Sequence, residues 1–214
     1  MVSERNKAAG IAWAKRLFVA GGVLVAVTAA ALGHWLHEWP VHHFGVVVPG
    51  AIYRSGQPRA EQWETLARRY RIRTVIDLRG DRPGAEWQRE ELTFCAGAGI
   101  DHVRVSIGPE RITQDELGRM LSILADPARR PVLIHCEHGS SRTGVVVAAY
   151  RMLAEGWHLE AAMAESYRYH RPMNPGYTLY LRQLAGGEGC TPARVCRGDN
   201  PPHRATMVGD IDGG

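Results

Sequence analysis

The apolar positions of the chain are most concentrated near its N-terminus, in a run from Leu17 to Leu36 that reads LFVAGGVLVAVTAAALGHWL. This run contains no formally charged side chain, and its apolar residues would surround a helix on every face. About 20 residues at 1.5 Å per residue cover roughly 30 Å, which is the thickness of the hydrocarbon core of a bilayer. The pattern predicts a transmembrane helix or signal anchor over residues 17–36.

Beyond residue 45 the pattern changes to short apolar runs that alternate with amphipathic segments. Apolar runs bounded by turn residues predict strands at 46–48, near 52, and at 74–78, 102–107 and 132–135. Helical spacing predicts helices at 59–70, 86–98, 113–125, 144–155, 158–170 and 176–184. A capping box of Thr113 and Glu116 marks the start of the third helix. Alternating strands and helices are typical of an α/β domain in which helices flank a small central sheet.

These patterns divide the chain into five parts. They are a basic segment at 1–16, the apolar helix at 17–36, a linker at 37–45, the α/β domain at 46–184 and a tail at 185–214. The tail is rich in glycine, proline and charge, which predicts disorder. Cys190 and Cys196 lie in the tail. They are either two free thiols or, in an oxidising compartment, a local disulfide.

The charge of the chain is concentrated at its N-terminus. The net charge is +4, and residues 1–16 carry four basic residues against Glu4, which leaves +1 for the remainder. A chain without a further basic block does not indicate nucleic-acid binding. Lys15 and Arg16 precede the apolar run, and Trp35 and Trp39 lie at its far end. Because positive charge stays on the cytoplasmic side, we expect a cytoplasmic N-terminus and a domain on the outer side, periplasmic if the source is bacterial.

A cleaved signal peptide is the alternative for this segment. It would have the same basic start and apolar run, and Ala29-Ala30-Ala31 supplies small residues for cleavage. The run is long for a signal peptide, which favours a single-pass anchor that is retained.

The chain's candidate for chemistry is the segment His135-Cys136-Glu137-His138-Gly139-Ser140-Ser141-Arg142-Thr143-Gly144, which follows a predicted buried strand and leads into a predicted helix. The N-terminus of a helix offers unpaired N–H groups and a partial positive charge, and both attract phosphate. Gly139 permits a backbone conformation that a side chain would block, and the small residues Ser140 and Ser141 let consecutive N–H groups turn inward. The segment is therefore predicted to bind a phosphate dianion.

Two residues of this loop are predicted to carry the reaction. Helix N-termini and cations favour the thiolate form of cysteine, so Cys136 is the predicted nucleophile. Arg142 lies six residues later, where a planar guanidinium can grip two phosphate oxygens. Thr143 or a loop serine is expected to hydrogen-bond the sulfur, while Glu137 and His138 either contact substrate or only face solvent. A buried structural cysteine beside a surface arginine is the alternative interpretation.

The motif His135-Cys136-x5-Arg142-Thr143-Gly144 resembles the signature of the protein tyrosine phosphatase superfamily. The segments Tyr53 to Pro58 and Val75 to Arg79 are similar to the early strands of its compact dual-specificity branch, including bacterial members. The resemblance covers residues 46–184 and implies a cysteine-based phosphatase domain that follows a membrane segment. It implies a phosphomonoester hydrolase that acts on phosphorylated protein or small phosphomonoesters through a phosphocysteine intermediate. It implies neither a metal nor another cofactor.

The general acid of the resembled family does not have an obvious counterpart here. That family places an aspartate about 30 residues before the cysteine to protonate the leaving oxygen, and this chain has none there. The candidates are Glu110, which we favour, Asp115 and Asp81, or else a substrate that needs no acid. The missing aspartate keeps open a catalytically weak module that only binds phosphate or phosphoprotein.

Other positions concern specificity and support of the loop. The loop contains no lysine, which argues against a highly charged inositol substrate because the resembled inositol enzymes often carry lysines there. We expect Asp77 to pair with a nearby arginine such as Arg79, and Tyr53 and Arg54 to brace the loop. The sequence does not indicate an oligomeric state.

Overall fold

The chain divides between Val41 and His42 into two compact units. The computed structural model describes residues 2–38, 41–108, 112–169 and 173–187. The first unit is helix α1 (Val2–Glu38), which includes both the predicted basic segment and the predicted apolar segment. Within α1, Lys15–Gly33 is long and apolar enough to cross a membrane, with a mean hydropathy of 1.9. A signal sequence meets the same criteria of length and composition.

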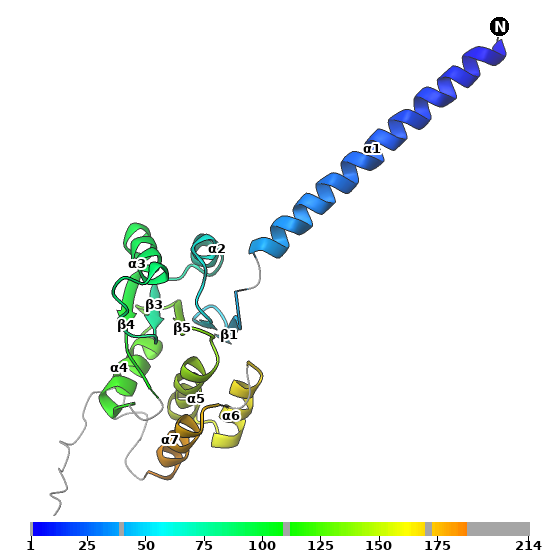
Figure 1. The fold of residues 1–214 in the computed structure, drawn as a ribbon. Coiled ribbons are helices and arrows are strands. Elements are labelled where there is room, and N and C mark those ends of the chain that lie inside the picture. Colours follow the sequence, from blue (N-terminus) through cyan, green and yellow to red (C-terminus); the bar gives the residue numbers. More distant parts are fainter. Residues whose placement is uncertain (1, 39–40, 109–111, 170–172, 188–214) are drawn as a thin grey trace, which may run out of the picture. The chain divides into compact units, whose positions relative to one another are not determined.

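The second unit is an α/β domain built on a mixed five-stranded sheet (Figure 1). Its strand order is β1-β2-β5-β3-β4, in which β1 runs antiparallel to β2 and the other neighbours are parallel. The strands are β1 (Gly45–Val48), β2 (Ile52–Ser55), β3 (Thr74–Asp77), β4 (Asp101–Arg104) and β5 (Val132–His135). Every residue of β3 and β5 is buried, as expected for central parallel strands that are covered on both faces.

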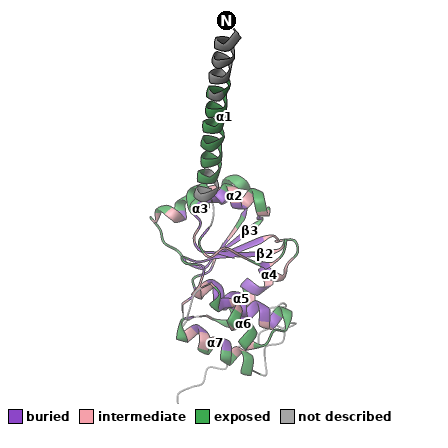
Figure 2. Ribbon diagram, turned by 90° about the vertical axis from the view of Figure 1, so that its right-hand side faces the viewer, coloured by how far each residue is buried: buried purple, intermediate pink, exposed green. Residues whose placement is uncertain are grey.

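Helices cover both faces of the sheet (Figure 2). One face carries α2 (Ala60–Tyr70) and α3 (Glu86–Ala98). The other carries α4 (Gln114–Ala125) and α5 (Ser141–Glu155), and α6 (Leu159–Tyr167) and α7 (Pro175–Gly186) pack against α5. The central position of α5 explains why its residues are buried from Thr143 to Arg151 without a polar stripe.

The alternation of side chains along the strands separates an apolar core from a polar one. Ile76 and Ile134 face α4 and α5 and belong to the main hydrophobic cluster. Asp77 and His135 follow them in sequence and so face the opposite layer. There the ring of His135 packs edge-on against the ring of Trp63 of α2, with ring centroids 5.8 Å apart. In the register of the parallel strands, His135 of β5 lies opposite Asp77 of β3 on one side and opposite Ser55 of β2 on the other. The carboxyl ends of these strands therefore meet where the loop of Cys136 begins.

Several predicted elements agree with the structure, and others differ in extent, among them the helix predicted at 158–170, which ends at Tyr167. Helix α3 and strand β5 have the predicted bounds, and the capping box at the start of α4 is confirmed. The predicted strand 102–107 is wrong in extent: β4 ends at Arg104. Val105 and Ile107 stay buried against the core, so their alternation reflected burial rather than further sheet pairing. Helix α5 begins at Ser141 rather than at 144, because the chain already coils there: the N–H of Gly144 donates to the C=O of Ser140 at 2.6 Å.

Candidate active site

The loop between β5 and α5 closes around the sulfur of Cys136. This residue is buried, and its Sγ accepts a hydrogen bond from the N–H of Gly139 at 3.2 Å. Gly139 has φ of 71°, in the left-handed region that favours glycine. The first N–H groups of α5 lack acceptors within the helix and point their partial positive charge toward the loop. This environment stabilises an anion, either a thiolate or a bound phosphate.

Three consecutive carbonyl groups of the loop are held away from the sulfur by donors on neighbouring segments. The pairs are Glu137 C=O with the N–H of Gln57 (3.0 Å), His138 C=O with Nδ1 of His43 (2.6 Å) and Gly139 C=O with Nη2 of Arg54 (2.8 Å). A trans peptide places its N–H opposite its C=O. Fixing the carbonyls outward therefore directs the N–H groups inward, which is the arrangement an anion requires.

Arg54 supports the loop carbonyl of Gly139 from inside the domain. Its side chain is 1% exposed and lies over the ring of Tyr169 at 3.8 Å. Burial lowers the pKa of Arg54 to about 10, so the guanidinium still carries its charge at neutral pH. The predicted role of Arg54 in bracing the loop is confirmed by its bond to Gly139. Tyr53 faces the other way and packs against Tyr70, with ring centroids 4.6 Å apart.

A pocket of about 210 Å³ lies at the loop. Its lining combines six loop residues with the beginning of α7: Cys136, Glu137, His138, Ser140, Ser141, Arg142, Asn174 and Tyr177. The nucleophile and the arginine predicted from the sequence are thus brought to one cavity. Gly139 and Thr143 are buried behind this lining.

Arg142 and Tyr177 both line the pocket, and the side chain of Tyr177 is almost fully buried. Burial raises the pKa of Tyr177, and the charge and hydrogen bond of Arg142 offset part of that rise. The tyrosine therefore stays neutral beside the charged arginine.

The sequence from residue 39 to residue 181, more than half of the chain, matches the tyrosine phosphatase family. The chain belongs to this family. Relatives that match the chain are named as phosphatases. The loop of Cys136 and Arg142 is the part of the chain that fits this chemistry.

Two relatives illustrate the range of the family. Inositol diphosphatase SIW14 of Saccharomyces cerevisiae is 32% identical over 138 residues, which are 62% of this chain and 47% of that protein. Dual specificity protein phosphatase TpbA of Pseudomonas aeruginosa strain UCBPP-PA14 is 30% identical over 160 residues, 65% of this chain and 69% of that protein. The chain thus spans about half the length of the yeast relative.

Solved structures agree with the fold of the domain. The core catalytic domain of SIW14, solved in complex with citrate, superposes with a TM-score of 0.62 at 26% identity, covering 74% of this chain and 92% of that one. The structure of P. aeruginosa TpbA superposes with a TM-score of 0.56 at 23% identity, covering 73% and 90%. The α/β architecture, with helices on both faces of a mixed sheet, is therefore that of the dual-specificity-like phosphatases.

Two of the three candidate acids, Asp81 and Asp115, lie away from the pocket lining. Asp81 is exposed and pairs with Arg104, whose Nη1 lies 2.9 Å from its carboxylate. Asp115 is an exposed residue in the first turn of α4. Neither of them lines the pocket. Glu110 lies outside the described residues, as do Cys190 and Cys196.

The prediction that Asp77 pairs with a nearby arginine is confirmed, but the partner is not the Arg79 given as the example. The carboxylate of Asp77 pairs with the side chain of Arg104, not with that of Arg79, because β3 and β4 are neighbours in register. Arg79 instead gives Asp77 its backbone N–H at 2.8 Å. The prediction that Thr143 or a loop serine bonds the sulfur fails for Thr143, whose hydroxyl is buried without a hydrogen-bond partner in the described part of the chain; the sulfur accepts from the N–H of Gly139.

Asn174 and Tyr177 are the pocket residues that the sequence analysis missed. Asn174 caps α7, with its side chain accepting from the N–H of Gly176, and Pro175 follows it at the first helical position. The pair Asn-Pro signals the start of a helix. Only the packing of α7 against α5 brings that start to the loop, and no local pattern encodes it.

The bond between Tyr177 and Arg142 leads to a first prediction. Replacing Tyr177 by phenylalanine is expected to lower kcat/KM about tenfold, because a hydrogen bond to a charged group is lost while the ring remains. Steady-state hydrolysis of p-nitrophenyl phosphate measures the effect. Tyr167→Phe, on α6 and outside the pocket lining, is the control and is expected to leave kcat/KM unchanged. Equal behaviour of the two variants would contradict the role of Tyr177.

Proposed function

We propose that this chain hydrolyses phosphomonoesters with Cys136 as nucleophile and Arg142 as the group that binds the transferring phosphoryl. The observation that supports this most directly is the outward fixing of three successive loop carbonyls around the buried sulfur. A structural cysteine needs no such arrangement, whereas a phosphate dianion does.

The reaction proceeds in two displacements at phosphorus. The thiolate of Cys136 attacks phosphorus, a P–S bond forms, and the ester P–O bond breaks as the leaving oxygen takes a proton. Water then attacks the phosphocysteine, which releases inorganic phosphate and regenerates the thiolate. The inward N–H groups and the guanidinium of Arg142 bind the phosphoryl oxygens, where charge develops in both transition states.

The direct test is turnover by the purified full chain. Release of p-nitrophenol that is unaffected by EDTA, together with a trapped phosphate on the Cys136 peptide after acid quenching, is the expected result. The alternative is a module that binds phosphate without turning it over. Binding of vanadate with no release of p-nitrophenol would overturn the proposed hydrolase and favour that alternative.

For the general acid we propose Glu110, which precedes α4 in the sequence. Protonation of the leaving group matters most when that group is poor. Glu110→Gln is therefore expected to slow hydrolysis of phenyl phosphate about 100-fold and that of p-nitrophenyl phosphate much less. Asp115→Asn and Asp81→Asn are the matched comparisons. A selective loss in one of these variants, with Glu110→Gln unaffected, would assign the acid to that aspartate.

For the substrate we propose a phosphorylated protein or a small phosphomonoester, as in the dual-specificity branch. The relatives are named for inositol diphosphate and for protein substrates, so both classes are candidates. The loop contributes the exposed carboxylate of Glu137 and no lysine, which disfavours a densely charged polyphosphate at the rim. Parallel assays with a phosphotyrosine peptide and an inositol diphosphate decide between them; faster turnover of the latter would overturn this assignment.

We also propose that residues 17–36 anchor the chain as a single-pass segment, with residues 1–16 in the cytoplasm, a linker at 37–45, the phosphatase domain at 46–184 on the outer side and a tail at 185–214. The support is the apolar helix Lys15–Gly33 with Lys15 and Arg16 at its start. An alkaline phosphatase reporter fused after residue 40 is expected to be active, and fused before residue 17 inactive. The reverse pattern would overturn this orientation.

A further inference from the structure

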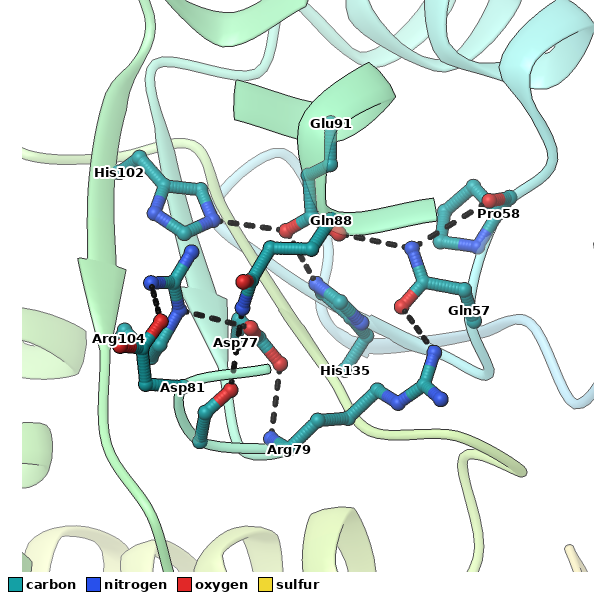
Figure 3. Close-up of polar contacts among 11 residues, drawn as sticks. Gln57, Pro58, Asp77, Arg79, Asp81, Gln88, Glu91, His102, Arg104 and His135 are labelled. Atoms are coloured by element: carbon teal, nitrogen blue, oxygen red, sulfur yellow. Dashed lines mark hydrogen bonds and ion pairs between the residues drawn. The ribbon is translucent and has the colours of Figure 1, made fainter. Parts of the chain in front are cut away.

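The carboxylate of Glu91 on α3 contacts His135, His102 and Gln57 (Figure 3). Its Oε1 lies 3.0 Å from Nε2 of His135 and 2.8 Å from Nε2 of His102. Its Oε2 accepts from Nε2 of Gln57 at 2.7 Å. His135 immediately precedes Cys136. The backbone N–H of Gln57 donates a hydrogen bond to the carbonyl of Glu137, the residue that follows Cys136.

The charges in this cluster follow from its burial. Glu91 and His135 are 1% and 0% exposed, so an ionised side chain there requires a counter-ion. Burial acts to lower the pKa of His135, but the charge and hydrogen bond of Glu91 outweigh it and raise the pKa to about 9. Burial likewise acts to raise the pKa of Glu91, but His135 and the hydrogen bonds from His102 and Gln57 hold it well below the ordinary range. The two residues form an ion pair at neutral pH.

The remaining charged groups near His135 leave Glu91 as its counter-ion. On β3 and β4, Asp77 is paired with Arg104, which also binds Asp81. His102 contacts the same carboxylate oxygen of Glu91 that contacts His135. From α2, the uncharged ring of Trp63 packs edge-on against His135. Arg54 of β2 points into the opposite layer, toward Tyr169. Cys136 is the next anionic group along the chain.

We propose that Glu91 is a positioning residue for the nucleophile of the proposed hydrolase: it holds a charged His135 directly behind Cys136 and, through Gln57, fixes the peptide that follows the cysteine. A positive charge at that place favours the thiolate over the thiol, because the loop is shielded from water there. The histidine of the loop thus acts with a partner 44 residues away in sequence.

The test is the reactivity of Cys136 in Glu91→Gln, which removes the charge of the carboxylate and nearly keeps its shape. Alkylation of the full chain by iodoacetamide is followed at the Cys136 peptide by mass spectrometry over a range of pH. The rate at about pH 6 is expected to fall about tenfold, and to return to the unsubstituted rate at about pH 9. Glu90→Gln, at the exposed neighbouring position of α3, is the matched control and is expected to leave the whole profile unchanged.

Two outcomes of this experiment would overturn the proposal: an unchanged profile, or a loss of the same factor at every pH, which indicates a general loss of structure. Because alkylation needs no turnover, the result stands apart from the success or failure of the p-nitrophenyl phosphate assay. The unsubstituted chain gives a second readout that needs no variant to fold. Nitrogen-15 NMR of the His135 ring at about pH 7.5 is expected to show both ring nitrogens protonated. A ring with one protonated nitrogen would also overturn the proposal.

Discussion

Replacing Cys136 by serine is expected to abolish turnover of p-nitrophenyl phosphate, by about 10⁴-fold or more. A serine hydroxyl stays protonated at neutral pH without an adjacent base, and the described residues that line the pocket place no such base on the sulfur: its hydrogen-bond partner is the N–H of Gly139. The inward N–H groups and Arg142 remain in this variant. It should therefore still bind phosphate or vanadate, which calorimetry can measure beside the rate.

Cys95 provides the matched control for this substitution. It is also a buried cysteine, on α3, but burial and the charge of Glu91 raise the pKa of its thiol to about 12. It is therefore protonated and unreactive at neutral pH, and Cys95→Ala is expected to retain turnover. Activity that survives in Cys136→Ser, or that depends on Cys95 in a folded variant, would contradict the assignment of the nucleophile.

The parts of this fold that local sequence encodes could be predicted. The bounds of α3 and β5 follow from helical spacing and from an apolar run, and the loop from Cys136 to Arg142 is a contiguous segment whose chemistry needs no knowledge of its neighbours. The capping box that opens α4 is likewise local, with its two residues three positions apart. For such features the pattern along the chain and the structure carry the same information.

The support of the loop could not be predicted in the same way. Arg54 is predicted to brace the loop, but Gln57 and Glu91 are not: they reach it because β2 lies beside β5 and α3 covers one face of the sheet. Asp77 pairs with Arg104 and not with Arg79 because the register of β3 and β4 decides the partner. Tyr177 enters the pocket through the packing of α7 on α5. Each of these contacts joins segments far apart in sequence, and hydrophobic periodicity does not predict which distant segments meet.

Gly139 is where the loop meets this support most closely, and Gly139→Ala is expected to cost both stability and activity. A Cβ at this position would lie less than 3.0 Å from backbone atoms of Ser55 and Gly56, which cannot rotate away as a side chain can. The loop would have to move from the end of β2. That movement would break the hydrogen bond from Arg54 to the carbonyl of residue 139. We expect a loss of about 3 kcal/mol or more in the free energy of unfolding, measured by urea denaturation, and a fall in kcat of about 100-fold.

Gly50→Ala separates the effect of the close approach from that of the backbone conformation. Gly50 has φ of 72°, almost the value of 71° at Gly139, but a Cβ there meets nothing within 4 Å. The left-handed conformation alone costs an alanine roughly 1 kcal/mol, and kcat should be unchanged because Gly50 lies in the turn between β1 and β2. The difference between the two variants measures the contact of the loop with β2. If both variants lose the same stability and retain the same kcat, that contact does not position the catalytic loop.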